Sequence, residues 1–150
     1  MILDGDEVRE KLSKGLGFSK EDRTENIRRV AYVCRLINQV DGIAIAALIS
    51  PFRLDRQEAR LEVGNYVEVY VNCPLEVCEK RDLKGHYAKA RAGELHQSTL
   101  VSDPYEEPLD PQIVLDTDKQ TPEESLCHMA EELKRLGLLY SPSSQDMRPA

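Results

Sequence analysis

Two carboxylates separated by a single glycine stand near the start of the 150-residue chain, and an arginine follows them after one helical turn. These residues are Asp4, Asp6 and Arg9. Carboxylates in such a pair can hold Mg²⁺ through water or accept a proton from a substrate hydroxyl. The arginine fork can bind an oxyanion. The alternative is a glycine turn in which an aspartate caps the next helix, and the pattern alone leaves both interpretations open.

A second candidate group combines an aromatic residue with basic and polar side chains. Phe18 follows a glycine, and Arg23, Asn26 and Arg29 then recur every three residues, on roughly one face of a helix. Near the start of a helix such residues can bind an anion together, and an aromatic ring on a loop can stack on a base. The alternatives are a solvated basic face paired with neighbouring glutamates and a phenylalanine that fills the core.

The third candidate follows the most apolar run of the chain, residues 43–49. Ser50 and Arg53 come directly after that run, so a loop there places a hydroxyl, backbone groups and an arginine at the edge of the sheet where ligands bind. Arg56 and Arg60 lie further along, and we expect them to be structural or to face solvent.

A fourth stretch is basic and contains Lys84, Lys89 and Arg91. A basic helix between two irregular segments can close over phosphates as a lid. The alternative is an exposed amphipathic helix.

The elements that must position these residues alternate between helix and strand. This alternation predicts an α/β fold in which helices cover both faces of a parallel sheet, with the run 43–49 as a strand buried on both faces. Ligands of such sheets lie beyond the carboxyl ends of the strands, which directs attention to residues 4–6, 50–53 and 116–117. Ser19 or Asp22 is expected to cap the second helix. The predicted helices are 7–14, 24–39, 54–63, 75–81 and 122–136, and the predicted strands are 1–3, 43–49, 66–71 and 113–115, with an irregular loop over 103–111.

Length and composition suit one domain over residues 1–140, followed by a Ser/Pro-rich tail, 141–150, that we expect to be disordered. Lys and Arg number 20 against 27 Asp and Glu, and this acidic balance argues against nucleic acid as the partner. No apolar run is long enough to cross a membrane, and no secretory signal is evident. The four cysteines offer only one close pair, Cys73 and Cys78, so we expect reduced thiols in the cytoplasm rather than a zinc site.

Taken together, these motifs resemble the adenylylsulfate kinase family, whose members use ATP to phosphorylate the 3′-hydroxyl of adenosine 5′-phosphosulfate. The resemblance implies a P-loop kinase-like fold with a parallel sheet sandwiched by helices, and it extends from about Leu3 to Thr117. The matching stretches, in the order of the family, are LDGDEVR, LGFSKEDRTENIRRVA, ISPFRLDRQEAR, EVYVNCPLEVCEKRDLKGHYAKARAGEL and DPYEEPLDPQIVLDT.

The resemblance also implies a role for each matching residue. Asp6 matches the carboxylate that takes the hydroxyl proton, and Asp4 matches its partner near the Mg²⁺ that accompanies ATP. Ser50 matches a serine described in some members as a phosphoserine intermediate, although direct in-line transfer needs none. The residues that match contacts to the phosphosulfate nucleotide are Arg9, Phe18 (stacked on the adenine), Arg23, Asn26, the backbone of Ile49 and Ser50, and Lys84. The lid corresponds to Lys84, Gly85, Tyr87, Lys89 and Arg91.

One departure from the family is the absence of any G-x-x-x-x-G-K-[ST] segment in these 150 residues. In the family that loop and the strand before it lie just upstream of LDGD. Without them the sheet lacks its first strand, the two strands beside it have unpaired edges, and the phosphates of ATP lack their amide cradle and lysine. We expect the isolated chain to be inactive, and to be poorly soluble or dependent on assembly.

A second departure lies after the lid. The family has Phe-Thr-Gly there, whose phenylalanine closes the other face of the substrate adenine, but this chain has Ser98 and Leu100 at the outer positions. A base-stacking contact is worth about 1–3 kcal/mol, so the affinity for the substrate is expected to be about one to two orders of magnitude lower.

Three hypotheses follow. In the first, the protein is an adenylylsulfate kinase of sulfate assimilation and the sequence lacks its true start. In the second, the chain is a non-catalytic pseudokinase that binds nucleotide weakly, or a partner subunit of a true kinase or of a sulfurylase. In the third, it is a small-molecule kinase of the same fold that acts on another hydroxyl. A homodimer is an expectation from the resemblance alone.

Overall fold

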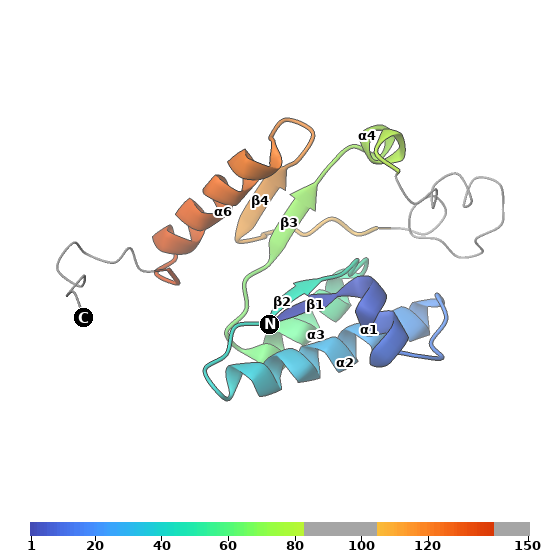
Figure 1. Cartoon of the computed structure of the whole chain (residues 1–150). Helices are drawn as coiled ribbons and strands as arrows, with labels where there is room; N and C mark the ends of the chain where they lie inside the picture. Colours follow the sequence, from blue (N-terminus) through green and yellow to red (C-terminus); the bar gives the residue numbers. More distant parts are fainter. Residues whose placement is uncertain (83–104, 140–150) are drawn as a thin grey trace. The chain divides into compact units, whose positions relative to one another are not determined.

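The computed structural model describes residues 1–82 and 105–139. These residues divide into two compact units (Figure 1). The first unit holds residues 1–66 together with 82 and 105–109, and the second holds residues 67–81 and 110–139. The prediction of one domain over residues 1–140 stays a prediction, and the tail 141–150 lies outside the described residues.

The first unit places three helices around a two-stranded parallel sheet. Strands β1 (Ile2–Asp4) and β2 (Ile45–Ala47) pair with Ile2 opposite Ile45 and Asp4 opposite Ala47. The helices are α1 (Gly5–Lys11), α2 (Lys20–Asn38) and α3 (Arg53–Val63).

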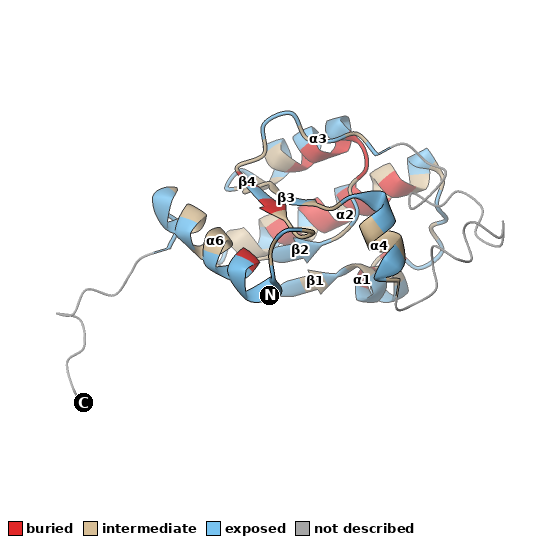
Figure 2. Ribbon diagram, turned by 90° about the horizontal axis from the view of Figure 1, so that it is seen from above, coloured by how far each residue is buried: buried red, intermediate tan, exposed pale blue. Residues whose placement is uncertain are grey.

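Helix α2 supplies most of the core of this unit. Its apolar residues recur at helical spacing, and Figure 2 shows buried positions on both α2 and α3. One cluster joins Val8 of α1 to α2, and Leu3 and Leu48 from β1 and the end of β2 pack against it. A second cluster joins α2 to Ala59 of α3. The buried apolar residues of α2 are Ile27, Val30, Ala31 and Cys34, as their spacing predicts.

The prediction that residues 43–49 form a strand buried on both faces is wrong. The strand is shorter, and Ile43, Ile45 and Ile49 are 72%, 56% and 52% exposed. Ala44 and Leu48 pack into the core beneath α2. Because side chains alternate along a strand, Ile43, Ile45 and Ile49 lie on the opposite side from Ala44 and Leu48, away from that core. Strand β2 pairs with β1 alone among the described strands.

The second unit contains strands β3 (Val69–Asn72) and β4 (Ile113–Asp116), which pair in parallel with Val69 opposite Ile113. Helix α4 (Leu75–Lys80) follows β3, and helix α6 (Pro122–Arg135) follows β4. Ile113 is buried in this unit. Thr121 caps α6 in a reciprocal capping box with Glu124. This box fixes the start of the helix at Pro122, the predicted position.

Several element boundaries differ from the predictions. Helix α2 begins at Lys20 rather than Thr24, because Ser19 is its cap and accepts a hydrogen bond from the Asp22 amide at 3.1 Å. Helix α1 runs from Gly5 to Lys11 rather than over 7–14, and β3 starts at Val69. Helix α4 begins at Leu75, as predicted, with Pro74 at its N-cap position, and ends at Lys80. Within residues 1–82 and 105–139, no helix is long and apolar enough to span a membrane.

Candidate functional site

Two arginines converge on the loop that connects α1 to α2. Arg9 of α1 donates from Nη1 to the Gly17 carbonyl oxygen at 2.7 Å, and Arg23 of α2 donates from Nε to the Phe18 carbonyl oxygen at 2.9 Å. Their guanidinium carbons lie 4.9 and 5.4 Å from the centre of the Phe18 ring. Phe18 is 52% exposed, so it does not fill the core and its ring is accessible to a ligand.

The electrostatics of this cluster favour an anion. Arg23 is buried. Desolvation, followed by the positive charge of Arg23, lowers the pKa of Arg9, and the carboxylate of Asp22 partly offsets this. Two like charges held close together repel each other, and an anionic ligand bound between them would relieve that repulsion.

Asn26 follows Arg23 by one turn of α2 and is also buried. Its Oδ1 atom has no hydrogen-bond partner among the described residues, and neither does the buried Oγ of Ser13 at the end of α1. A buried acceptor without a donor costs free energy. A ligand that donates a hydrogen bond to Asn26 would remove that cost.

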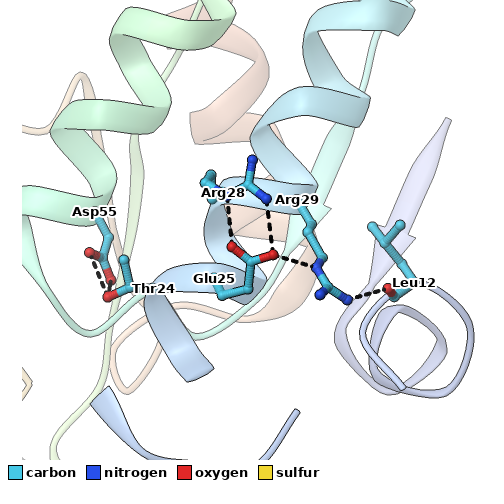
Figure 3. A network of polar contacts seen from close by, with 6 residues as sticks. All are labelled: Leu12, Thr24, Glu25, Arg28, Arg29 and Asp55. Atoms are coloured by element: carbon cyan, nitrogen blue, oxygen red, sulfur yellow. Dashed lines mark hydrogen bonds and ion pairs between the residues drawn. The ribbon is translucent and has the colours of Figure 1, made fainter. Parts of the chain in front are cut away.

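Arg29 does not join Arg23 and Asn26 as an anion-binding residue. It donates from Nε to Glu25 at 2.7 Å and from Nη1 to the Leu12 carbonyl oxygen at 3.1 Å (Figure 3). Arg28 also binds Glu25, from Nε at 2.7 Å. The alternative of a basic face paired with glutamate is therefore confirmed for these two arginines, and Arg29 ties the end of α1 to α2.

The same turn of α2 is tied to α3. The Thr24 hydroxyl donates to both carboxylate oxygens of Asp55, at 3.0 and 3.1 Å (Figure 3). Burial raises the pKa of Asp55, and the hydrogen bond from Thr24 partly offsets that increase. Helix α2 is thus fixed on two sides, which holds Arg23 and Asn26 in place.

Glu25 gives this network a pH dependence that can be measured. Its hydrogen bonds from Arg28 and Arg29 lower its pKa from 4.5 to about 2. Because the folded-state pKa is depressed, the stabilisation by Glu25 is present above pH 4.5 and is lost as the pH falls through about 2. We expect the difference in unfolding free energy between wild type and Glu25→Gln to shrink over that range in urea titrations. This difference should also shrink in high salt, because the ion pairs of Glu25 with Arg28 and Arg29 are partly exposed. A difference independent of pH would contradict this.

Asp4 and Asp6 lie where β1 passes into α1. Asp4 caps the helix, since its Oδ1 atom accepts hydrogen bonds from the amides of Asp6 at 3.0 Å and Glu7 at 3.4 Å. The capping alternative is therefore confirmed for Asp4. Asp6 lies in the first turn and is exposed, so its carboxylate can be reached by a substrate.

Removal of the Asp4 cap has a defined cost. We expect Asp4→Ala to lower the unfolding free energy by about 1 kcal/mol, the usual value of a lost N-cap. Asp4→Asn should retain most of the stability, because asparagine caps as well as aspartate. Urea denaturation of the two variants tests this, and equal losses in both would show that the charge rather than the cap matters.

The end of β2 lies close to the first turn of α1. A Cβ atom on Gly5 would come within 3.3 Å of the Ala47 carbonyl oxygen, so the start of α1 packs directly against the strand that leads to Ser50. Ile49 is half exposed. The Ser50 carbonyl oxygen accepts a hydrogen bond from Arg56 Nη1 at 2.5 Å.

Comparison with known proteins identifies the family. The family model described as Adenylylsulphate kinase matches residues 1–116. The chain belongs to the adenylylsulfate kinase family. It is 54% identical to the adenylyl-sulfate kinase of Halothermothrix orenii over 140 residues, which are 93% of this chain and 76% of that protein. It is 52% identical to the adenylyl-sulfate kinase of Rippkaea orientalis, over 94% of this chain and 78% of that one.

A solved structure shows the same fold. The Mycobacterium tuberculosis APS kinase CysC in complex with AMPPNP and APS matches with a TM-score of 0.80 at 36% identity, over 89% of this chain and 79% of that one. The predicted α/β, P-loop kinase-like fold class is thereby confirmed. The strands of the described residues are parallel, as expected for this fold.

Among the residues that match adenylylsulfate kinase motifs, Arg9, Phe18 and Arg23 are in contact. Asn26 lies on α2, one turn after Arg23. The structure places Asp4 and Asp6 beside the strand that precedes Ile49 and Ser50. The following predicted positions lie outside the described residues: Lys84, Gly85, Tyr87, Lys89, Arg91, Ser98 and Leu100.

Residues 116–117, the third strand end at which the sequence predicts a ligand, make hydrogen bonds within the second unit. Asp116 accepts from Asn72 Nδ2 at 2.7 Å, which, together with the charge of Lys119, lowers its pKa. Thr117 donates from its amide and its hydroxyl to the Asn72 carbonyl oxygen. Within residues 1–82 and 105–139, no group of three or more His, Cys, Asp or Glu side chains forms a metal site.

The sequence does not indicate the contacts of Arg56 with Tyr105 and Glu106. Arg56 donates from Nη2 to the Glu106 carbonyl oxygen at 2.6 Å and lies over the Tyr105 ring. The expectation that Arg56 is structural is confirmed, but its partners are about fifty positions away, and no local spacing indicates them.

Proposed function

We propose that this member of the adenylylsulfate kinase family transfers the γ-phosphoryl group of ATP to the 3′-hydroxyl of adenosine 5′-phosphosulfate, giving 3′-phosphoadenosine 5′-phosphosulfate, in the cytoplasm. The observation that carries the proposal is the cluster of Arg9, Phe18 and Arg23, with Asn26 one turn away. The accessible ring offers a stacking surface for adenine, and the two arginines offer charge and donors for the phosphosulfate.

In this reaction the 3′-oxygen attacks the γ-phosphorus, the bond to the β–γ bridging oxygen breaks, and ADP leaves. Asp6 accepts the proton of the 3′-hydroxyl, because it is an exposed carboxylate at the strand end beside the substrate loop. Positioning and charge neutralisation supply most of the rate in phosphoryl transfer. The backbone of Ile49 and Ser50 contributes a contact to the substrate, and direct in-line transfer requires no phosphoserine at Ser50.

ATP brings Mg²⁺, which neutralises the developing charge on the phosphates. Such an ion keeps several waters and needs only one or two carboxylates. Asp6 fits this requirement because it is exposed at the end of β1. One oxygen of Asp4 accepts the hydrogen bonds of the helix cap. We therefore propose that Asp6 would hold the ion through water and that Asp4 would contribute its charge.

The 150 residues contain no G-x-x-x-x-G-K-[ST] segment, so we expect the isolated 150-residue protein to show no ATP-dependent transfer to adenosine 5′-phosphosulfate. The phosphates of ATP lack both the amide cradle and the lysine that position them. An assay with γ-labelled ATP on protein of verified mass tests this. Robust turnover by the 150-residue protein would contradict the expectation.

The experiment that tests the proposed function uses the protein isolated from its native source. Its intact mass and its formation of labelled 3′-phosphoadenosine 5′-phosphosulfate would be measured on one preparation. A mass above 17.0 kDa, peptides that contain the glycine-rich loop, and turnover together support the kinase. A native protein that carries the loop but does not phosphorylate adenosine 5′-phosphosulfate overturns it.

A second candidate function is a non-catalytic, weakly nucleotide-binding subunit, either as a homodimer or beside a sulfurylase. The observation that favours it is the exposure of Ile45 in β2 and of Ile43 and Ile49 on either side of it, which leaves apolar surface for another chain. A native mass of 17.0 kDa, with a co-purifying partner and no turnover, would select this alternative.

A further inference from the structure

The segment that contains residues 105–107 is hydrogen-bonded to the loop between β2 and α3. The Glu106 amide donates to the Pro51 carbonyl oxygen at 2.8 Å. The Arg53 amide donates to Glu106 Oε2, and Arg53 Nε donates to the Glu107 carbonyl oxygen, both at 2.7 Å. The two segments therefore hold each other in register although they are about fifty residues apart.

Glu106 also replaces a missing helix cap. Phe52 occupies the N-cap position of α3 and makes no capping hydrogen bond with its side chain. The carboxylate of Glu106 accepts from the first amide of the helix instead. A negative charge at this end also interacts favourably with the helix dipole, so the start of α3 depends on this distant residue.

Arg56 spans both segments. Its guanidinium donates from Nη1 to the Ser50 carbonyl oxygen at 2.5 Å and from Nη2 to the Glu106 carbonyl oxygen at 2.6 Å, and it lies 5.7 Å from the centre of the Tyr105 ring. The side chain is buried. Only the planar fork of arginine presents donors to two carbonyl groups in this arrangement, so Arg56 fixes the direction of the Ser50 carbonyl.

We propose that Arg56 is a positioning residue for the binding of adenosine 5′-phosphosulfate. By holding the Ser50 carbonyl against the 105–107 segment, it presents the backbone of Ile49 and Ser50 to the substrate in one conformation. Arg56 does not touch the substrate and acts through Ser50. This inference rests on the proposed function, because it assumes that the Ile49–Ser50 backbone contacts the nucleotide.

The test compares two variants of α3 in the purified protein. Arg56→Lys keeps the positive charge but cannot bridge both carbonyl groups. Ala59→Gly destabilises the same helix, because glycine is a poor helix former, and leaves the hydrogen bonds of Arg56 in place. The dissociation constant for adenosine 5′-phosphosulfate is measured by calorimetry, and the thermal midpoint and the exchange rate of the Glu106 amide are measured alongside.

We expect Arg56→Lys to bind adenosine 5′-phosphosulfate about tenfold more weakly and to exchange the Glu106 amide faster. Ala59→Gly should bind as wild type does, even with a lower thermal midpoint. Wild-type affinity in Arg56→Lys would overturn this inference but not the proposed function. Equal weakening in Ala59→Gly would do the same, because it would indicate a general loss of stability. The absence of binding by wild type overturns the proposed function and this inference together.

Discussion

Arg23→Ala is expected to weaken the binding of adenosine 5′-phosphosulfate by about a hundredfold, which corresponds to about 3 kcal/mol. Arg23 is 6% exposed, lies over the Phe18 ring and holds the Phe18 carbonyl group. The substitution therefore removes a charged donor for the anion and also loosens the loop that presents the aromatic ring. Isothermal titration calorimetry on the purified protein measures the effect.

The matched control is Arg28→Ala on the same helix. Arg28 is mostly exposed and pairs with Glu25, so its loss should leave the affinity within about twofold of wild type, as is usual for an exposed ion pair. Arg23→Lys separates charge from geometry, since it keeps the charge but loses the planar fork. Equal affinities of Arg23→Ala and Arg28→Ala would show that the anion binds elsewhere.

Asp6→Asn is expected to lower kcat by about 100- to 10,000-fold in the catalytically active form of the protein, the range typical of a lost general base. Asparagine keeps the size of the side chain but cannot accept the 3′-hydroxyl proton. The affinity for adenosine 5′-phosphosulfate should change little, because the hydrogen bonds of Arg9 and Arg23 to the Gly17 and Phe18 carbonyl oxygens remain in place. Initial rates of product formation at saturating substrates give the measurement.

Glu10→Gln serves as the control for Asp6. It lies one turn further along α1, is exposed and pairs only with the adjacent Lys11 among the ion pairs of the described residues. Its kcat should therefore match that of wild type. If Asp6→Asn turns over as fast as Glu10→Gln, then Asp6 does not act as the base.

Local sequence patterns account for much of the fold. The caps Ser19 and Thr121 mark the starts of α2 and α6, and each acts through an amide three residues later. The spacing of apolar residues identifies the buried face of α2. Such signals are readable because the interacting atoms lie within one or two turns of each other.

Contacts between distant segments could not be predicted in this way. The apolar run 43–49 predicts burial on both faces, yet Ile43 and Ile45 are exposed, because the number of neighbours of a strand is set by other segments. The hydrogen bonds of Arg56 to Ser50 and Glu106 depend on the return of the chain after about fifty residues. Arg29 shares the sequence spacing of Arg23 and Asn26, but its guanidinium donates hydrogen bonds to Glu25 and to the Leu12 carbonyl oxygen.

Resemblance to the family identifies the candidate site more completely than local spacing does. The spacing of Arg23 and Asn26 identifies one helix face, but it does not place Arg9 against the same loop. The structure does so through the Gly17 and Phe18 carbonyl groups. Because these groups belong to a short loop between two helices, the contact depends on how α1 and α2 pack.

The central claim is that adenosine 5′-phosphosulfate binds at the cluster of Arg9, Phe18, Arg23 and Asn26. A titration of the isotopically labelled protein with this nucleotide, followed by amide and aromatic NMR shifts, tests it most directly. The account predicts saturable shifts that are largest for the Phe18 ring and for the amides of residues 17–26 and 49–50. Saturable shifts confined to other residues, or none at millimolar nucleotide, would contradict it.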